Sequence, residues 1–127
     1  MAGSDDIEPA FARLVGDRAH GLIVVPSAPI NSRIQIVSLA AKRRLPAMYP
    51  DSQYVRAGGL MSYAADSSDL HRRAATYIDR VLKGAKLGDL PIQQPTKFEL
   101  VINLRTATAL GLMIPPSVLV RADQTLE

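Results

Sequence analysis

Two short apolar runs separated by a polar segment constrain the fold more than any other feature of this sequence. They are Pro46–Tyr49 and Gly59–Tyr63, within the stretch LPAMYPDSQYVRAGGLMSYAAD. Short apolar runs between Pro, Asp and Gly are typical of strands that are buried on both faces. Such strands occur mainly in α/β proteins, where helices cover both sides of a parallel sheet. We therefore predict two neighbouring strands, with Pro50–Gly58 as the loop between them.

The segment before these strands alternates between helical and strand patterns. Apolar residues at helical spacing predict a helix over Ile7–Val15, and the uninterrupted apolar run Gly21–Pro26 predicts a buried strand. A second helix is expected from Asn31 or Ser32, either of which can cap it, to about Arg44. Its buried stripe is predicted to be Ile34, Val37, Leu39, Ala40 and Ala41. The order helix–strand–helix–strand is that of a right-handed parallel crossover.

The rest of the chain begins with the longest predicted helix. Asp66–Gly84 has apolar residues at helical spacing and a Gly that can end it, and Ser67, Ser68 or Asp66 can cap its N-terminus. Lys86–Thr96, with its Gly and Pro residues, is expected to be a connecting loop, and Phe98–Asn103 a strand. A short helix over Thr106–Gly111 and a terminal helix from Pro115–Pro116 follow. The predicted fold class is α/β, a single three-layer domain with a mainly parallel sheet.

Composition and missing motifs exclude several classes of function. The chain has 127 residues and no Cys, so disulfides, thiolate metal sites and cysteine nucleophiles are excluded. A formal net charge of +3 is too small and too dispersed to indicate a nucleic-acid partner. The phosphate-binding loop, the dinucleotide fingerprint and the serine nucleophile elbow do not occur. His20 and His71 have no carboxylate at metal-ligand spacing, so we expect no metal, no cofactor and no enzymatic activity.

Small polar and aromatic residues lie where the predicted strands end. In an open parallel sheet the carboxyl ends of the strands meet at one edge, and ligands bind there. Hydroxyl, amide and phenol groups at such an edge suit hydrogen bonding to a small polar ligand. The candidate ligand-binding residues are Ser27, Asn31, Tyr49, Tyr54, Ser62 and Tyr63. The alternative, that Tyr49 and Tyr63 only cover the end of the sheet, stays open on the residues alone.

Several longer motifs resemble a known family. GLIVVPSAPINSR, GGLMSY, RRAATYIDRVLKGAK and PTKFELVINL are similar to the C-terminal part of bacterial ABC-transporter substrate-binding proteins, in the group related to tryptophan and tyrosine uptake. The resemblance spans nearly the whole chain. It implies the two-lobed type I periplasmic-binding fold, outside the cytoplasm, and a hinge protein that closes on a small solute. An amino acid is the expected solute, and an ABC permease the expected partner.

The resemblance also implies how the chain is divided between the lobes. Leu22–Tyr63 would belong to the second lobe, the helix around Arg72–Gly84 would cross back to the first, and the Phe98–Leu104 strand would return. The signal peptide, the first lobe and the opening strands of the second lobe have no counterpart in this sequence. We therefore expect residues 1–127 to be a C-terminal lobe fragment with half of the ligand cleft.

A fragment of this kind would expose the apolar stripe of its long helix. Leaving such a stripe in water is unfavourable, so we expect homo-oligomers that form through the surface left by the missing lobe. The alternative function is a stand-alone ligand-sensing or protein-interaction module without transport. An enzyme that uses Asp51 or Asp66 is disfavoured, because the sequence shows no nucleophile–base pair and no metal set.

Overall fold

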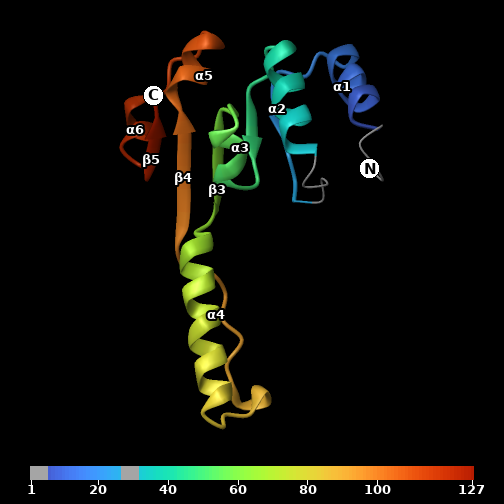
Figure 1. Ribbon diagram of the computed structural model, residues 1–127. Helices are drawn as coiled ribbons and strands as arrows, with labels where there is room; N and C mark the ends of the chain where they lie inside the picture. The colour runs from blue at the N-terminus through green and yellow to red at the C-terminus, as the bar shows by residue number, and fades with distance from the viewer. Residues whose placement is uncertain (1–5, 27–31) are drawn as a thin grey trace.

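A twisted sheet forms the centre of the fold in the computed structural model, which describes residues 6–26 and 32–127 (Figure 1). Within these residues five strands form one sheet in the order β1-β2-β3-β4-β5. The strands are β1 (Leu22–Ile23), β2 (Ala47–Tyr49), β3 (Met61–Ala65), β4 (Phe98–Asn103) and β5 (Gln124–Leu126). All pairings are parallel except β3 with β4, which is antiparallel. The predicted α/β class with a mainly parallel sheet is therefore confirmed.

Helices connect the strands and cover them. They are α1 (Ile7–Gly16), α2 (Arg33–Lys42), α3 (Ser52–Arg56), α4 (Ser67–Leu82), α5 (Leu104–Ala109) and α6 (Pro116–Leu119), with a 3-10 turn at Leu87–Asp89. None of the helices in the described part of the chain is long and apolar enough to cross a membrane. Helix α2 links β1 to β2 and α3 links β2 to β3, so both links between parallel strands are helical.

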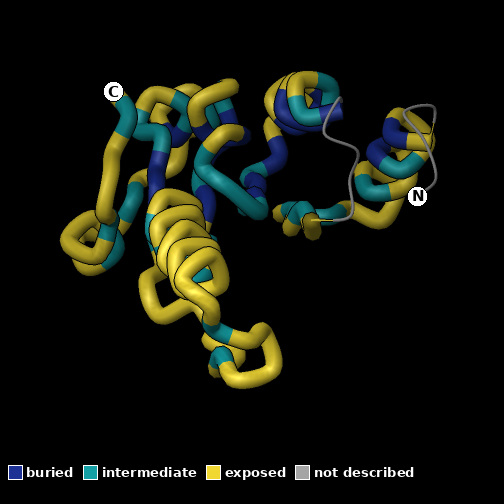
Figure 2. The backbone as a smooth tube through the Cα atoms, turned by 60° about the horizontal axis from the view of Figure 1, so that its bottom comes forward, coloured by how far each residue is buried: buried dark blue, intermediate teal, exposed yellow. Residues whose placement is uncertain are grey.

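The main core lies between α1, α2 and one face of the sheet. Ile7 and Phe11 of α1 are buried against Ile36 and Ala40 of α2 in a single apolar cluster. The cluster continues onto the sheet through Ala47 and Tyr49 of β2, and it includes Leu45 before this strand and Tyr54 of α3. Figure 2 shows the same distribution, with buried backbone in the body of the molecule and exposed backbone along α4. The opposite face of the sheet carries Met48, Met61, Tyr63 and Phe98, and α6 contributes Val118 to that side.

The structure corrects three predictions about local elements. Pro50–Gly58 is not only a loop, because Asp51 accepts a hydrogen bond from the Gln53 N–H at 2.8 Å and caps helix α3. The packed face of α2 is centred on Ile36 and Ala40, so Ile34, which is 76% exposed, and Ala41, which is also exposed, lie outside the buried stripe. Strand β5 was not predicted. Strand β1 is shorter than the apolar run that indicated it and is not the buried strand expected, because Ile23 is 73% exposed.

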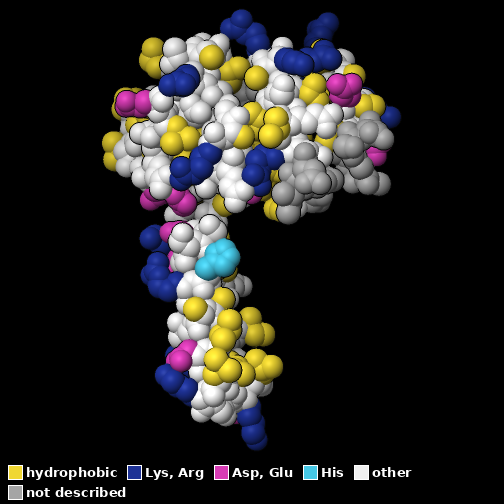
Figure 3. All heavy atoms as spheres, in the orientation of Figure 1, with side chains coloured by type: hydrophobic (Ala, Val, Ile, Leu, Met, Phe, Trp, Pro, Cys, Tyr) yellow, Lys and Arg dark blue, Asp and Glu magenta, His cyan; other side chains and the backbone are white. Residues whose placement is uncertain are grey.

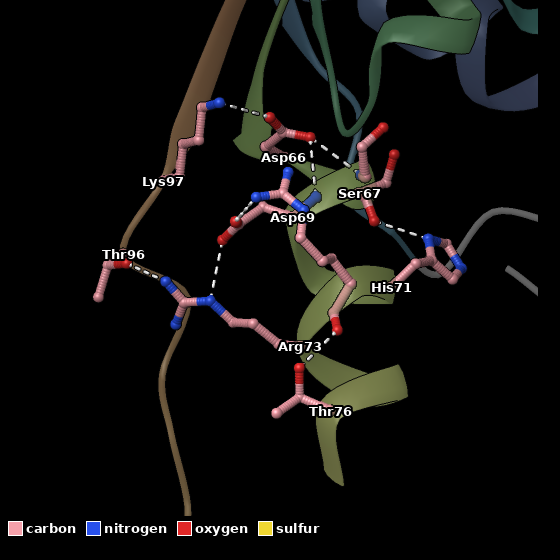
Figure 4. A network of polar contacts seen from close by, with 10 residues as sticks. Asp66, Ser67, Asp69, His71, Arg73, Thr76, Thr96 and Lys97 are labelled. Atoms are coloured by element: carbon pink, nitrogen blue, oxygen red, sulfur yellow. Dashed lines mark hydrogen bonds and ion pairs between the residues drawn. The ribbon is translucent and has the colours of Figure 1, made fainter. Parts of the chain in front are cut away.

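Helix α4 and the segment that follows it form an arm that leaves the body of the protein (Figure 1). Of the three predicted caps, Asp66 is the one observed, since its carboxylate accepts hydrogen bonds from the N–H groups of Ser68 and Asp69. Figure 4 shows how the returning chain is attached: Lys97 pairs with Asp66, and Arg73 donates to Thr96 while pairing with Asp69. We call residues 67–97 the arm.

No residue of α4 is buried, and the arm carries apolar side chains on its surface. Figure 3 shows them gathered toward its far end. Ile78 is 59% exposed, Leu82 81% and Ile92 fully exposed. An uncovered apolar surface of this kind marks an interaction site more often than a solvated face.

Candidate functional site

The carboxyl ends of β1, β2 and β3 meet at one edge of the sheet, because these strands run parallel. Helix α2 returns from the end of β1 to the start of β2, so its N-terminus, at Ser32 and Arg33, lies at the same edge. The arm starts there too, after β3 (Figure 1). This edge, where ligands bind in open α/β sheets, is the candidate functional site.

Two tyrosines and an arginine are stacked at this edge. The Tyr49 and Tyr54 rings are stacked, with centroids 5.2 Å apart and planes inclined by 17°. The Arg33 guanidinium carbon lies 5.3 Å from the centroid of the Tyr54 ring, within the range of a cation–π contact. Tyr49 is 2% exposed and Tyr54 4%, so both rings are held by the core.

Burial keeps both phenols in their neutral form. It raises the pKa of Tyr49 to about 12, and the neighbouring Tyr54 adds to this shift. Burial and the Asp51 carboxylate raise the pKa of Tyr54, while the Arg33 cation acts in the opposite direction. At neutral pH the stack therefore offers phenol groups that can donate or accept hydrogen bonds, and one fixed positive charge.

The structure divides the remaining candidate residues between the two faces of the sheet. Ser62 is 1% exposed and pairs in register with Tyr49, so their side chains lie on the same face. Tyr63 points to the other face, where it is 57% exposed and stacks on Phe98 with ring centroids 5.6 Å apart. Ser27 and Asn31 lie outside the described residues. The structure thus brings Tyr49, Tyr54 and Ser62 to one side and leaves Tyr63 on the other.

Two residues at the start of α2 were missed by the sequence prediction of the site. Ser32 occupies the N-cap position and is 2% exposed, but its side chain makes no capping hydrogen bond. Among the described residues, Ser32 Oγ and Arg33 Nε are the buried side-chain polar atoms without a hydrogen-bond partner. Ser32 was considered only as a cap, and Arg33 only as part of the predicted helix. The sequence signal that could have found Arg33 is its position: it is a basic residue directly after the N-cap of a helix that follows a strand.

The carboxylates near this edge have structural roles. Asp51 caps α3 and Asp66 caps α4. The hydrogen bond from the Asp69 N–H holds the pKa of Asp66 below its usual value, and contacts with Lys97 and the Ser68 N–H act in the same direction. Within residues 6–26 and 32–127 no three His, Cys, Asp or Glu side chains come together as a metal site would require.

Gly59 fixes the position of the Tyr49 ring. A Cβ on Gly59 would lie 2.5 Å from Tyr49 Cε2 and 2.9 Å from the Tyr54 carbonyl oxygen, closer than such atoms can approach. The preceding Gly58 has φ of +109°, a conformation that favours glycine. Its carbonyl oxygen accepts a hydrogen bond of 2.9 Å from Thr106 Oγ1 of α5. The glycine pair is therefore a turn before β3 that leaves room for the buried Tyr49 ring.

A cavity of about 270 Å³ lies on the same face but toward the amino ends of β2 and β3. Its walls come from the C-terminal half of α2, from Leu45 and Leu60, and from Arg105 and Leu110 around α5. On the other face, a hollow of about 580 Å³ is lined by Met48, Met61, Tyr63 and Phe98, among others. The first is also lined by Tyr49, Gly58 and Gly59, so it reaches one side of the Tyr49 ring, and the second lies on the Tyr63 side of the sheet.

Solved structures share this fold across almost the whole chain. A conserved domain protein from Vibrio cholerae O1 biovar El Tor has a TM-score of 0.87 and 25% identity, covering 98% of this chain and 42% of that one. An ABC domain from Streptococcus pneumoniae, in complex with L-Trp, has a TM-score of 0.85 and 29% identity, covering 99% and 44%. A ligand-free, open substrate binding protein from Clostridium difficile has a TM-score of 0.69 at 18% identity and covers 43% of that chain.

Sequence comparisons agree with the structural ones. A tyrosine-binding protein of Clostridioides difficile (strain R20291) is 29% identical over 113 residues, which are 88% of this chain and 32% of that protein. The chain therefore spans about a third of this curated relative and less than half of the solved structures. The family model for ABC transporter substrate binding proteins matches residues 2–126. Since that match covers nearly every residue, the chain belongs to the ABC transporter substrate binding protein family.

Proposed function

We propose that this chain is the C-terminal lobe of a solute-binding protein for ABC import, and that its solute is an aromatic amino acid. The observation that carries the proposal is the likeness to the L-Trp complex, which extends over 99% of this chain. The name of the tyrosine-binding relative supports the same class of solute. The stacked pair of Tyr49 and Tyr54 at the carboxyl edge supplies aromatic and hydrogen-bonding surface that suits such a ligand.

The chain would supply one wall of the binding cleft. It covers 42% and 44% of two solved relatives, so the remainder of such a protein would provide the opposite wall. In this proposal the arm crosses to the other lobe and its exposed apolar residues pack there. The role is binding rather than catalysis, the partner is an ABC permease, and the site of action is periplasmic or extracytoplasmic, as for the family.

Residues 1–127 on their own would keep the apolar surface of the arm exposed. We expect that surface to drive self-association of the isolated chain, by dimerisation or by exchange of the C-terminal segment. The same surface is the observation that favours the alternative, a stand-alone protein-interaction module. Solute binding separates the two, because an interaction module without a sensing role has no need to bind an amino acid.

Ligand fluorescence provides a direct test, because the chain contains no Trp and all indole emission then comes from the ligand. L-Trp is titrated with the chain, and L-Tyr, L-Phe and L-Leu are added as competitors. A rise in indole anisotropy that L-Tyr and L-Phe reverse, and L-Leu does not, would support the proposal. Because the chain supplies one wall of the cleft, we expect its own binding to be weak or absent, and the proposal is wrong if L-Leu reverses the anisotropy as well as L-Tyr and L-Phe do.

A further inference from the structure

The cavity of about 270 Å³ between α2 and α5 has the lining of a site for a small molecule. The buried part of its wall is predominantly apolar and includes Val37, Ala40, Leu45, Ala47 and Leu60. A cavity of about 150 Å³ accommodates a benzene ring, so this one has room for a ring with a short side chain. The interior of the cavity therefore suits a ligand with an apolar body of that size.

The entrance of this cavity, formed by its exposed lining residues, is positively charged. These residues are Ala41 and Arg44, from the end of α2 and the turn after it, and Arg105 and Ala109 of α5. Figure 3 shows Lys and Arg side chains over the end of the molecule where Figure 1 places these two helices. No Asp or Glu is among the described residues that line the cavity. The charge of the entrance therefore favours an anionic group over an ammonium group.

Hydrogen bonds already satisfy the other polar groups around the cavity and leave the Arg44 guanidinium as the main donor. Thr106 Oγ1 donates to the Gly58 carbonyl oxygen at 2.9 Å, and Arg105 donates to a backbone oxygen of Glu127 at 3.2 Å. Each ion pair between two described residues lies within residues 66–97, so no carboxylate side chain of the described chain pairs with Arg44. The planar fork of N–H groups in a guanidinium matches the two oxygens of a carboxylate.

The way α2 ends holds Arg44 at the entrance. The Arg44 N–H donates to the Ala41 carbonyl oxygen at 3.0 Å, and the Leu45 N–H donates to the Ala40 carbonyl oxygen at 2.9 Å. Arg44 has φ of +54°, the left-handed conformation that this helix ending requires and that glycine adopts most readily. Arg44→Gly therefore removes the guanidinium and relieves the backbone strain in the same step.

We propose that this cavity is a second binding site, and that it binds a small aromatic carboxylic acid as the anion. The ring occupies the apolar interior between α2, α5 and the sheet, and the carboxylate lies at the entrance, where Arg44 donates to it. An α-amino group is disfavoured, because no acidic side chain lines the cavity to pair with it. The site lies toward the amino ends of β2 and β3, so the inference does not depend on the function proposed for the carboxyl edge.

Matched ligands test the chemistry of this site in the full chain. Nuclear magnetic resonance titrations with 3-phenylpropionate follow the amide resonances of Gly58, Gly59 and Thr106, which line the cavity. The comparison ligands are 3-phenyl-1-propanol, which lacks the charge, L-phenylalanine, which adds an ammonium group, and acetate, which lacks the ring. We expect 3-phenylpropionate to bind about tenfold more tightly than each of the three, because only this ligand combines an apolar ring with an unopposed negative charge.

Matched variants test its location. Arg44→Gly should weaken binding of 3-phenylpropionate about tenfold without lowering the urea midpoint of unfolding. Arg18→Gly is the control, because Arg18 also has a left-handed backbone, with φ of +55°, but does not line the cavity. It should bind 3-phenylpropionate as the wild-type chain does. Ala41→Leu, at an exposed position of the entrance, adds volume without changing the charge and should also weaken binding.

Three results would overturn the proposal. Equal affinity for 3-phenylpropionate and 3-phenyl-1-propanol would show that the entrance does not recognise an anion. Binding that neither Arg44→Gly nor Ala41→Leu weakens, with amide shifts at Ser62 and Ser67 in place of Gly58 and Thr106, would place the ligand at the carboxyl edge. A folded wild-type chain whose Gly58, Gly59 and Thr106 resonances do not move at millimolar 3-phenylpropionate would exclude the site. None of these results bears on the amino-acid function, which the competition with L-Leu tests separately.

Discussion

Replacing Gly59 by Ala tests the packing that holds the Tyr49 ring at the candidate site. The new methyl group would lie 2.5 Å and 2.8 Å from two ring carbons of Tyr49, and 2.9 Å from the Tyr54 carbonyl oxygen. Tyr49 is 2% exposed and borders the cavity of about 270 Å³, so relief of these contacts requires its ring to shift toward that cavity. One of the three contacts is with backbone, which cannot move aside as the end of a flexible side chain can.

The size of the destabilisation caused by Gly59→Ala follows from two opposing effects. Overpacking of a core costs about 1–3 kcal/mol, and three contacts this short place Gly59→Ala at the upper end. The loss of glycine flexibility in the unfolded chain offsets about 0.4–1 kcal/mol of this. We therefore expect a net destabilisation of about 2 kcal/mol, which lowers the urea midpoint by roughly 1 M.

Urea unfolding followed by far-ultraviolet circular dichroism measures this difference. Gly88→Ala is the matched control, because a Cβ there meets no atom within 4 Å. A Tyr49→Val background removes the two ring contacts and leaves the Tyr54 carbonyl contact, so Gly59→Ala should cost less in that background. The reasoning is refuted if Gly59→Ala stays within about 0.5 kcal/mol of the wild-type chain, or if its cost is the same with and without the Tyr49 ring.

Three further predictions concern the arm and the titrating groups. Leu82 is 81% exposed, and Leu82→Asp should reduce the self-association expected for the isolated chain. Light scattering at micromolar concentration measures the self-association, and a monomeric wild-type chain would contradict the expectation. Because the pKa of Asp66 is lowered in the folded chain, its stabilising effect is present at neutral pH and is lost as the pH falls below about 4. Asp66→Asn removes this pH-dependent contribution to stability, so its acid unfolding transition should differ from that of the wild-type chain. An unchanged acid transition would contradict the assignment. Tyr49 has its pKa raised to about 12, so stability should fall as the pH rises from about 10 toward 12, and ultraviolet titration should show a phenol that ionises only there.

Local patterns in the sequence determined the elements whose stabilising contacts are near in the chain. The long arm helix was predicted because its apolar spacing, its Asp66 cap and its Gly stop are all local, and the cap forms as expected. The residues Phe98–Asn103 form a strand within the predicted bounds. Apolar runs that suit burial on both faces predicted the parallel pairing of β1, β2 and β3. The motifs were sufficient to identify the family, which the family match confirms.

Only the tertiary structure decided the features that depend on contacts between distant segments. Strand β5 has no apolar pattern of its own; it forms because Val101 and its neighbours offer a free edge, which Asp123 secures with two hydrogen bonds to Leu100. The two-residue period of β3 separates Ser62 from Tyr63, but only the register with β2 shows which of them joins Tyr49.

The candidate site depends on tertiary contacts for the same reason. Ser32 and Arg33 attract attention only once the fold buries their polar atoms without partners and places Tyr54 beneath the guanidinium, 21 residues along the chain. Spacing along the sequence contains no measure of burial or of an unmade hydrogen bond. The sequence by itself therefore determined the strand ends at which a ligand would bind. The packing of α2 and α3 on the sheet decided which side chains are held there to receive it.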